Sequence, residues 1–294
     1  MPLHYLNPLV CALFFALANI VLKRGMMDGT GALRCVFITN GTFFICLIPL
    51  WWIFPTPVDP TLLWAPVVAG IAAFLGSLFS TLALRVGDVS VATPLLGGKV
   101  LFVALLSTLI LGNQLPLSWW AGAVLAGAGI FFLGQGPGRK GAGGPLWLTI
   151  VLSLLGVFFF ALMDIIIAGW GKSFGFQRFV ALQQVVTFGL SLFLIPFFKE
   201  PLKNVPRHSL WWVFVGSLII VGQFFLLNWT IAMYRDPTAI NIVYSSRGVW
   251  SVILVWTVGR LLGNEERSRG TAVLAQRALG ALLLVIAISL VIVV

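Results

Sequence analysis

The sequence predicts an all-α integral membrane protein with ten transmembrane helices arranged as two inverted five-helix repeats. Of the 294 residues, 60% are hydrophobic and only 9% are charged, whereas soluble domains carry roughly a quarter charged residues. Apolar runs long enough to cross a bilayer recur along the whole chain, and the two halves resemble each other. Because so few polar residues cannot cover a water-facing surface, we expect the protein to be solvated by lipid.

The apolar runs predict the individual spans. A bilayer core about 30 Å thick requires about 20 apolar residues per helix, and helices are required because backbone amides in lipid must bond within their own segment. This rule predicts spans near residues 5–22, 32–54, 62–84, 89–111, 117–134, 146–168, 178–198, 209–233, 237–259 and 271–293. A Gly-rich, basic connector at 135–145 separates the first repeat, 1–134, from the second, 146–294.

Matching residues in the two halves predict the repeat. The segment Phe14–Ile20 reads against Phe159–Ile165, and Arg34 and Arg178 open the second helix of each half. Five spans in each half mean that the second copy enters the membrane from the opposite side. This inverted-topology repeat is typical of many secondary transporters.

The net charge of +10 predicts an orientation rather than a nucleic-acid partner, because most Lys and Arg residues lie in short loops between apolar runs. Leaving aside the two cations inside spans, thirteen of the remaining sixteen lie in the odd-numbered loops. The positive-inside rule then places these loops in the cytoplasm and both termini outside.

No catalytic or metal-binding motif is recognised in the sequence. Walker, zincin and nucleophile-elbow patterns are missing from it, so we expect neither an enzyme nor a cofactor, and no metal site. Cys11, Cys35 and Cys46 lie in apolar runs without metal-ligand spacing, and they are interpreted as small packing residues.

Two cations inside spans are the strongest functional signal. Lys99 and Arg247 lie near the middle of the fourth and ninth spans, each eleven residues after an aspartate, Asp88 and Asp236. A charge at the bilayer centre is costly and normally faces a partner or a wet cavity. Because the two cations occupy equivalent positions in the two halves, they predict a central anion site. There the arginine guanidinium would bind a phosphate or carboxylate through two parallel hydrogen bonds, and the lysine ammonium would add a second positive charge. The alternative is a structural ion pair, for instance with Asp164.

Neighbouring residues extend this candidate site. Asp164 is expected either to exchange a coupling proton or to neutralise a central cation. Residues at helical spacing from Arg247, or at positions equivalent in the repeat, are further substrate-binding candidates: Tyr244, Trp250, Ser251, Asn19 and Asn241.

Small residues at three- and four-residue spacing in the fifth span suit close helix contact. They are Gly122, Ala123, Ala126, Gly127 and Gly129. They predict either packing within the bundle or a dimer face, so a monomer and a homodimer both stay open.

The segment Thr81–Gly134, repeated more loosely at Ile231–Ala281, resembles the drug/metabolite transporter superfamily, especially its ten-helix EamA-type members. The resemblance implies a secondary carrier with alternating access and a central cavity. Lys99 and Arg247 look like matches to phosphate-binding cations of the phosphate-sugar translocators, whereas Ser246 stands where those relatives have a lysine. The resemblance also implies cytoplasmic termini, opposite to the charge count.

The sequence therefore predicts a multi-pass secondary transporter of a small organic anion in the inner (plasma) membrane. The expected partners are the anionic substrate, membrane lipid, and a coupling proton or a counter-substrate. Two alternatives are an exporter of amino acids or amphipathic drugs and a lipid headgroup flippase or scramblase.

Overall fold

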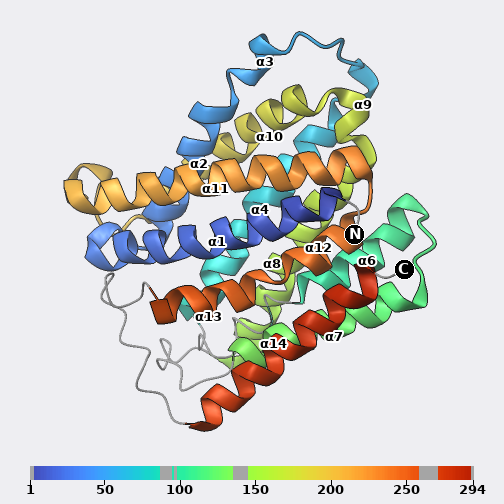
Figure 1. Ribbon diagram of the computed structural model, residues 1–294. Helices are drawn as coiled ribbons and strands as arrows, with labels where there is room; N and C mark the ends of the chain where they lie inside the picture. Colours follow the sequence, from blue (N-terminus) through green and yellow to red (C-terminus); the bar gives the residue numbers. More distant parts are fainter. Residues whose placement is uncertain (1–2, 87–94, 96–97, 135–144, 258–270, 293–294) are drawn as a thin grey trace.

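The computed structural model describes residues 3–86, 95, 98–134, 145–257 and 271–292. In this part of the chain the fold is a bundle of helices without strands (Figure 1). The helices are α1 (Leu6–Gly25), α2 (Ala32–Leu47), α3 (Leu50–Ile53), α4 (Trp64–Val86), α6 (Lys99–Leu111), α7 (Leu117–Gly134), α8 (Leu146–Ile166), α9 (Lys172–Phe174), α10 (Phe176–Ser191), α11 (Arg207–Tyr234), α12 (Pro237–Tyr244), α13 (Arg247–Thr257) and α14 (Thr271–Ile292). Short 3-10 turns are η1 (Leu3–Tyr5), η3 (Pro60–Leu62), η5 (Leu192–Phe197) and η6 (Leu202–Asn204), and π-helical turns are η2 (Met26–Thr30) and η4 (Ile167–Gly171).

Among the described residues, six helical stretches are long and apolar enough to cross a membrane. They are Leu3–Thr30, Ala32–Ile53, Pro60–Ala83, Trp147–Phe174, Phe176–Phe197 and Arg207–Tyr234. Large apolar side chains are exposed on many of the helices: Ile45, Trp52, Leu109, Phe131, Trp147, Phe193 and Trp211. An outer surface this apolar is suited to lipid rather than to water, which confirms an all-helical membrane protein.

The span predicted at 237–259 differs from the structure, because it is divided into α12 and α13 at Ser245–Ser246. The amide of Ser246 bonds to Val243 O in a tighter 3-10 turn, and the Ser245 hydroxyl donates to Ile242 O. Serine hydroxyls compete in this way for helical carbonyls. The span predicted at 89–111 is helical from Lys99 onward; most of its first part, and the connector before Pro145, lie outside the described residues.

The chain follows the same course after α1 and after α8. Each helix ends in a π-helical turn, η2 or η4, and a glycine then precedes α2 or α10. Gly31 has φ 72° and Gly175 has φ 91°, in the left-handed region that glycine adopts at low cost. Arg34 and Arg178 lie three residues beyond these glycines.

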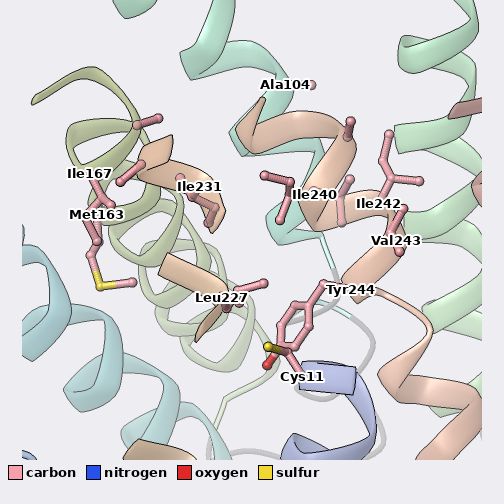
Figure 2. Close-up of a cluster of buried hydrophobic side chains, with 14 of the residues drawn as sticks. Cys11, Ala104, Met163, Ile167, Leu227, Ile231, Ile240, Ile242, Val243 and Tyr244 are labelled. Atoms are coloured by element: carbon pink, nitrogen blue, oxygen red, sulfur yellow. The ribbon is translucent and has the colours of Figure 1, made fainter. Parts of the chain in front are cut away.

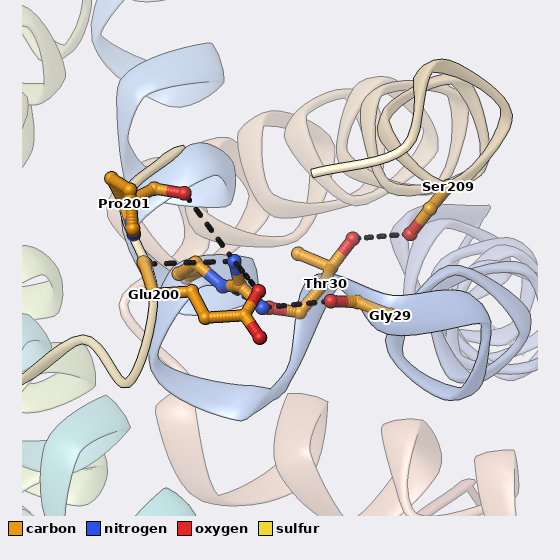
Figure 3. A network of polar contacts seen from close by, with 6 residues as sticks. Gly29, Thr30, Glu200, Pro201 and Ser209 are labelled. Atoms are coloured by element: carbon orange, nitrogen blue, oxygen red, sulfur yellow. Dashed lines mark hydrogen bonds and ion pairs between the residues drawn. The ribbon is translucent and has the colours of Figure 1, made fainter. Parts of the chain in front are cut away.

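Arg34 is buried at the start of α2. There it joins two distant segments, whose residues Gly29, Thr30, Glu200 and Pro201 are labelled in Figure 3. Its Nε donates to Thr30 O at 2.6 Å and its Nη2 to Gly29 O at 2.8 Å. Its Nη1 lies 3.5 Å from Pro201 O and 3.6 Å from a carboxylate oxygen of Glu200. The start of α2 is therefore attached to the loop that follows α10 and η5.

Arg178 makes the reciprocal contact at the start of α10. Its Nε donates to Trp51 O at 3.1 Å and its Nη1 to Thr56 O at 2.7 Å, while its guanidinium lies 5.1 Å from the Trp51 ring centroid. The start of α10 is thus attached to the chain at and after α3.

Three antiparallel or crossing pairs make the most extensive helix contacts: α1 with α11, α4 with α8, and α7 with α14. Figure 1 shows α1 and α11 side by side, with α7 and α14 together at one edge of the bundle. Around these pairs α10 packs on α4 and α2, α6 packs on α8, and α13 packs on α1.

The small residues of the fifth span are used inside the bundle. A Cβ built on Gly129 would lie 2.9 Å from Gly280 O, and one on Gly122 would lie 3.3 Å from Ala287 O. Both neighbours belong to α14, so this stripe lets α7 and α14 approach closely within one chain.

The hydrophobic core gathers residues from α1, α8, η4, α11 and α12 (Figure 2). Cys11 and Tyr244 lie at one end of this cluster and Ile240, Ile231 and Ile167 at the other. Cys11 is buried as a free thiol that donates to Gln223 O, as expected for a packing residue.

Candidate functional site

Lys99 and Asp164 form a buried ion pair. Lys99 opens α6, Asp164 lies near the end of α8, and Lys99 Nζ is 2.7 Å from Asp164 Oδ2. The two side chains are 12% and 1% exposed, so each charge depends on the other for compensation. The ion pair considered as the alternative role of Lys99 is therefore present.

Asn241 joins this pair from α12. Its Nδ2 donates to Asp164 Oδ2 at 2.8 Å and to Pro237 O at 2.9 Å. The other oxygen of Asp164, Oδ1, is buried without a hydrogen-bond partner in the described structure. Buried polar atoms are rarely left unpaired, so this oxygen marks a position for a proton or for a ligand donor.

Arg247 lies at the start of α13, between two aromatic rings. Its guanidinium carbon is 4.8 Å from the Phe15 ring centroid and 4.9 Å from that of Tyr244. The rings meet edge to face, 5.8 Å apart. The faces of aromatic rings stabilise a cation, and they contact the flat face of the guanidinium. The N–H donors of the guanidinium point outward from its edge. Across the described residues, no acidic side chain is within ion-pair distance of Arg247.

The two cations are electrostatically coupled. The positive charges of Arg247 and Lys99 repel each other, and the Tyr244 hydroxyl interacts electrostatically with both Arg247 and Asp164. Charges in a protein interior interact more strongly than in water because the local dielectric constant is low. Lys99, Asp164, Asn241, Tyr244 and Arg247 therefore form one polar cluster, which we call the central cluster.

The other substrate-binding candidates from the sequence, Asn19, Ser251 and Trp250, make contacts of a different kind. Asn19 is exposed on α1, and its Nδ2 donates to Phe15 O at 2.8 Å. Ser251 Oγ donates to Arg247 O at 2.8 Å. Trp250 is half-buried and packs against the core. The side-chain donors of Asn19 and Ser251 are thus used by their own helices.

Two residues near Arg247 were missed by sequence reasoning as parts of the site. Phe15 supplies a ring from α1, a contact between residues far apart in the sequence. Ser246 lies at the helix interruption, 6% exposed, and its hydroxyl oxygen has no hydrogen-bond partner among the described residues. The consecutive serines before Arg247 were a usable signal for the interruption, whereas nothing local in the sequence identified Phe15.

A cavity of about 320 Å³ opens where α6 ends and α12 begins. It is lined by Ser107, Asn113, Gln114, Leu115, Pro116, Trp119, Asp236, Pro237 and Thr238. Burial raises the pKa of Asp236, and the nearby His4 opposes this rise in part. Helix α12 runs from this cavity to Asn241. The equivalent aspartate of the first half, Asp88, lies outside the described residues.

Other buried amides bond between helices or pack in the interior. Asn40 Nδ2 on α2 donates to Ser191 Oγ on α10 at 2.7 Å, which is the interhelical use expected of polar residues in membrane bundles. Within the described ranges, no three His, Cys, Asp or Glu side chains are grouped so that they could hold a metal ion.

Residues 4–135 match the model of the EamA-like transporter family. A crystal structure of a protein shares the fold with a TM-score of 0.76 at 16% sequence identity, over 99% of this chain and 97% of that one. At this identity the likeness concerns the fold alone. Comparison with curated proteins gives no match. The resemblance seen in the sequence is confirmed over residues 4–135, and proteins of the EamA-like transporter family are membrane transporters and not enzymes.

Proposed function

We propose that this transporter is a secondary carrier of a small organic anion, which binds at the central cluster and crosses by alternating access. The observation that carries the proposal is Arg247, a half-buried guanidinium held between two rings with no acidic partner in the described residues. A guanidinium that no protein carboxylate neutralises is a suitable site for a carboxylate or phosphate of a substrate.

Lys99 contributes to the same site in a second way. An ammonium group has three donors, and the contact with Asp164 uses one of them. The remaining donors can meet a bound anion while the Asp164 contact is kept or exchanged. Tyr244 and Asn241 complete the polar surface, and Asp164 is the candidate for a coupling proton.

The proposed architecture is ten spans in two inverted five-helix repeats. In such a repeat α1 corresponds to α8, α4 to α11, and α6 to α13. The packing of α1 on α11 then corresponds to that of α8 on α4, and the packing of α13 on α1 corresponds to that of α6 on α8. The π-helical turns η2 and η4 correspond, as do Gly31 and Gly175. Arg34 and Arg178 make reciprocal contacts. These correspondences support rocking of one repeat against the other.

The proposed location is the inner (plasma) membrane. The charge distribution supports odd-numbered loops on the cytoplasmic side, and labelling of single cysteines introduced in the loops would test this orientation. The close contact of α7 with α14 within one chain supports a monomer as the transporting unit.

The test is transport by purified protein in liposomes. Vesicles loaded with a pool of organic acids and phosphate esters should take up labelled members of that pool by exchange. Arg247→Gln should reduce uptake about 10- to 100-fold, because one charge-assisted hydrogen-bonding partner is lost. Lys172→Gln removes an exposed cation and should leave uptake unchanged.

The outcomes separate the competing functions. Undiminished anion uptake by Arg247→Gln would contradict the anion site. Translocation of labelled lipid without flux of any soluble solute would favour the flippase, and uptake of amino acids or drugs alone would favour the exporter.

A further inference from the structure

The charged side chains of the central cluster have a formal net charge of +1. Lys99 and Arg247 are the two cations, and Asp164 is the single anion, in contact with Lys99. Helix α4 packs on α8 and carries no charged residue between Trp64 and Ala83.

Among the described residues, the other titratable groups at this cluster are a phenol and a thiol. Tyr244 faces Asp164 and Arg247 from α12, and Cys11 faces Tyr244 from α1. A phenol and a thiol ordinarily lose their protons only at alkaline pH. Among the described residues, the charge of the cluster is therefore set by Lys99, Arg247 and Asp164, and it changes when an ion or a proton binds there.

We propose that Asp164 is a specificity-determining residue that makes the site select monoanions over dianions. The proposal rests on the proposed function, since it assumes that an anion binds at Arg247. One monoanion neutralises a site of charge +1, whereas a dianion leaves one uncompensated negative charge in a low-dielectric interior, which is strongly unfavourable.

A dianion enters this site only together with a proton. Asp164 Oδ1 is buried and accepts no hydrogen bond from the described residues, so it is the acceptor available for that proton. Protonation of Asp164 leaves the two cations, Lys99 and Arg247, to balance both charges of the dianion. The substrate class is then a monocarboxylate or a phosphate diester, and a phosphate monoester binds only with uptake of a proton.

A matched pair of probes that differ by one charge tests the proposal. At pH 8 dimethyl phosphate is a monoanion, and methyl phosphate is mainly a dianion. Binding of each to the detergent-solubilised protein is followed by the rise in unfolding temperature, since a ligand of the folded state raises apparent stability. The wild-type protein should prefer dimethyl phosphate. Asp164→Asn, which raises the net charge to +2, should shift the affinity ratio toward methyl phosphate by about tenfold or more.

Two further measurements separate charge from shape. The double variant Lys99→Gln with Asp164→Asn restores the net charge of +1 and should return the ratio toward the wild-type value. Calorimetry in two buffers of different ionisation enthalpy should show one proton taken up for each methyl phosphate bound by the wild-type protein, and none in Asp164→Asn. Asp59→Asn, the same change at an exposed loop residue, is the control and should alter neither measurement.

Each outcome decides the question. A folded Asp164→Asn protein with an unchanged ratio overturns the selectivity role, as does wild-type protein that binds methyl phosphate without proton uptake. Should Asp164→Asn fail to fold, the double variant and the wild-type proton uptake carry the same test. Binding of neither probe at any pH would overturn the anion site itself, and with it the proposed function.

Discussion

The ammonium group of Lys99 lies 2.7 Å from Asp164 Oδ2, an oxygen that also accepts a hydrogen bond from Asn241. Lys99 belongs to the first half of the chain, and Asp164 and Asn241 belong to the second. This one carboxylate oxygen therefore joins α6, α8 and α12 inside the bundle. Any motion that separates α6 from α8 has to exchange this contact for another.

Removal of one member of the pair should destabilise the fold. Lys99→Met leaves the Asp164 carboxylate buried without its cation, and we expect a loss of about 3–5 kcal/mol. Adding Asp164→Leu removes the isolated charge and should recover most of that loss. Thermal and denaturant unfolding in detergent would measure both effects, and a Lys99→Met protein as stable as the wild type would contradict the importance of the pair.

The reciprocal arginines should both stabilise the bundle, by different amounts. Arg34→Ala should cost about 2–4 kcal/mol, because the carbonyls of Thr30 and Gly29 lose their buried donors. Arg178→Ala should cost about 1–2 kcal/mol, because its bond to Thr56 O is solvent-exposed.

The matched control for these variants is Lys203→Ala, an exposed cation in the loop near Arg34, which should change the unfolding temperature little. Equal, small effects of Arg34→Ala and Lys203→Ala would show that the arginine contacts do not hold the two halves together.

Adding a methyl group at the contact between α7 and α14 should lower the stability of the protein. In Gly280→Ala the new Cβ would lie 2.6 Å from Gly129 O, and overpacking of this kind costs about 1–3 kcal/mol. Gly222→Ala in α11 has no atom within 4 Å of the new Cβ and should be neutral or slightly stabilising. Unfolding of the two variants side by side is the measurement; loss of stability in Gly222→Ala alone would place the tight contact elsewhere.

Stability should depend on pH through Asp236. Burial raises its pKa above the ordinary value of 3.8, so the folded protein holds this proton more tightly than the unfolded chain. The resulting stabilisation is complete below pH 3.8 and is lost as the pH rises through the raised pKa. Asp236→Asn should therefore flatten the unfolding temperature between about pH 4 and 6.

Asp59 provides a control of opposite sign. Bonds from the Thr61 hydroxyl and amide lower the pKa of Asp59, so its contribution is present above the ordinary value and is lost as the pH falls. An Asp236→Asn profile that matches the wild type would rule out the raised pKa as a contributor to stability.

Much of the candidate site could be predicted from single residues. Lys99, Arg247 and Asp164 were recognisable because a charge inside an apolar run is costly, so each needs a compensating partner. Phe15 could not be predicted, since an aromatic residue in an apolar helix looks the same whether it faces lipid or a cation.

The sequence by itself determined that the chain lies in a membrane and that its elements are helices, because apolar run length and backbone hydrogen bonding are properties of one segment at a time. Local repetition in the same way predicts that the two halves correspond. Tertiary structure alone decided that Lys99 pairs with Asp164 while Arg247 lies between Phe15 and Tyr244, and that the small residues of α7 meet α14. These choices depend on which helices come into contact. Several arrangements of apolar helices satisfy the membrane equally well, and packing selects among them.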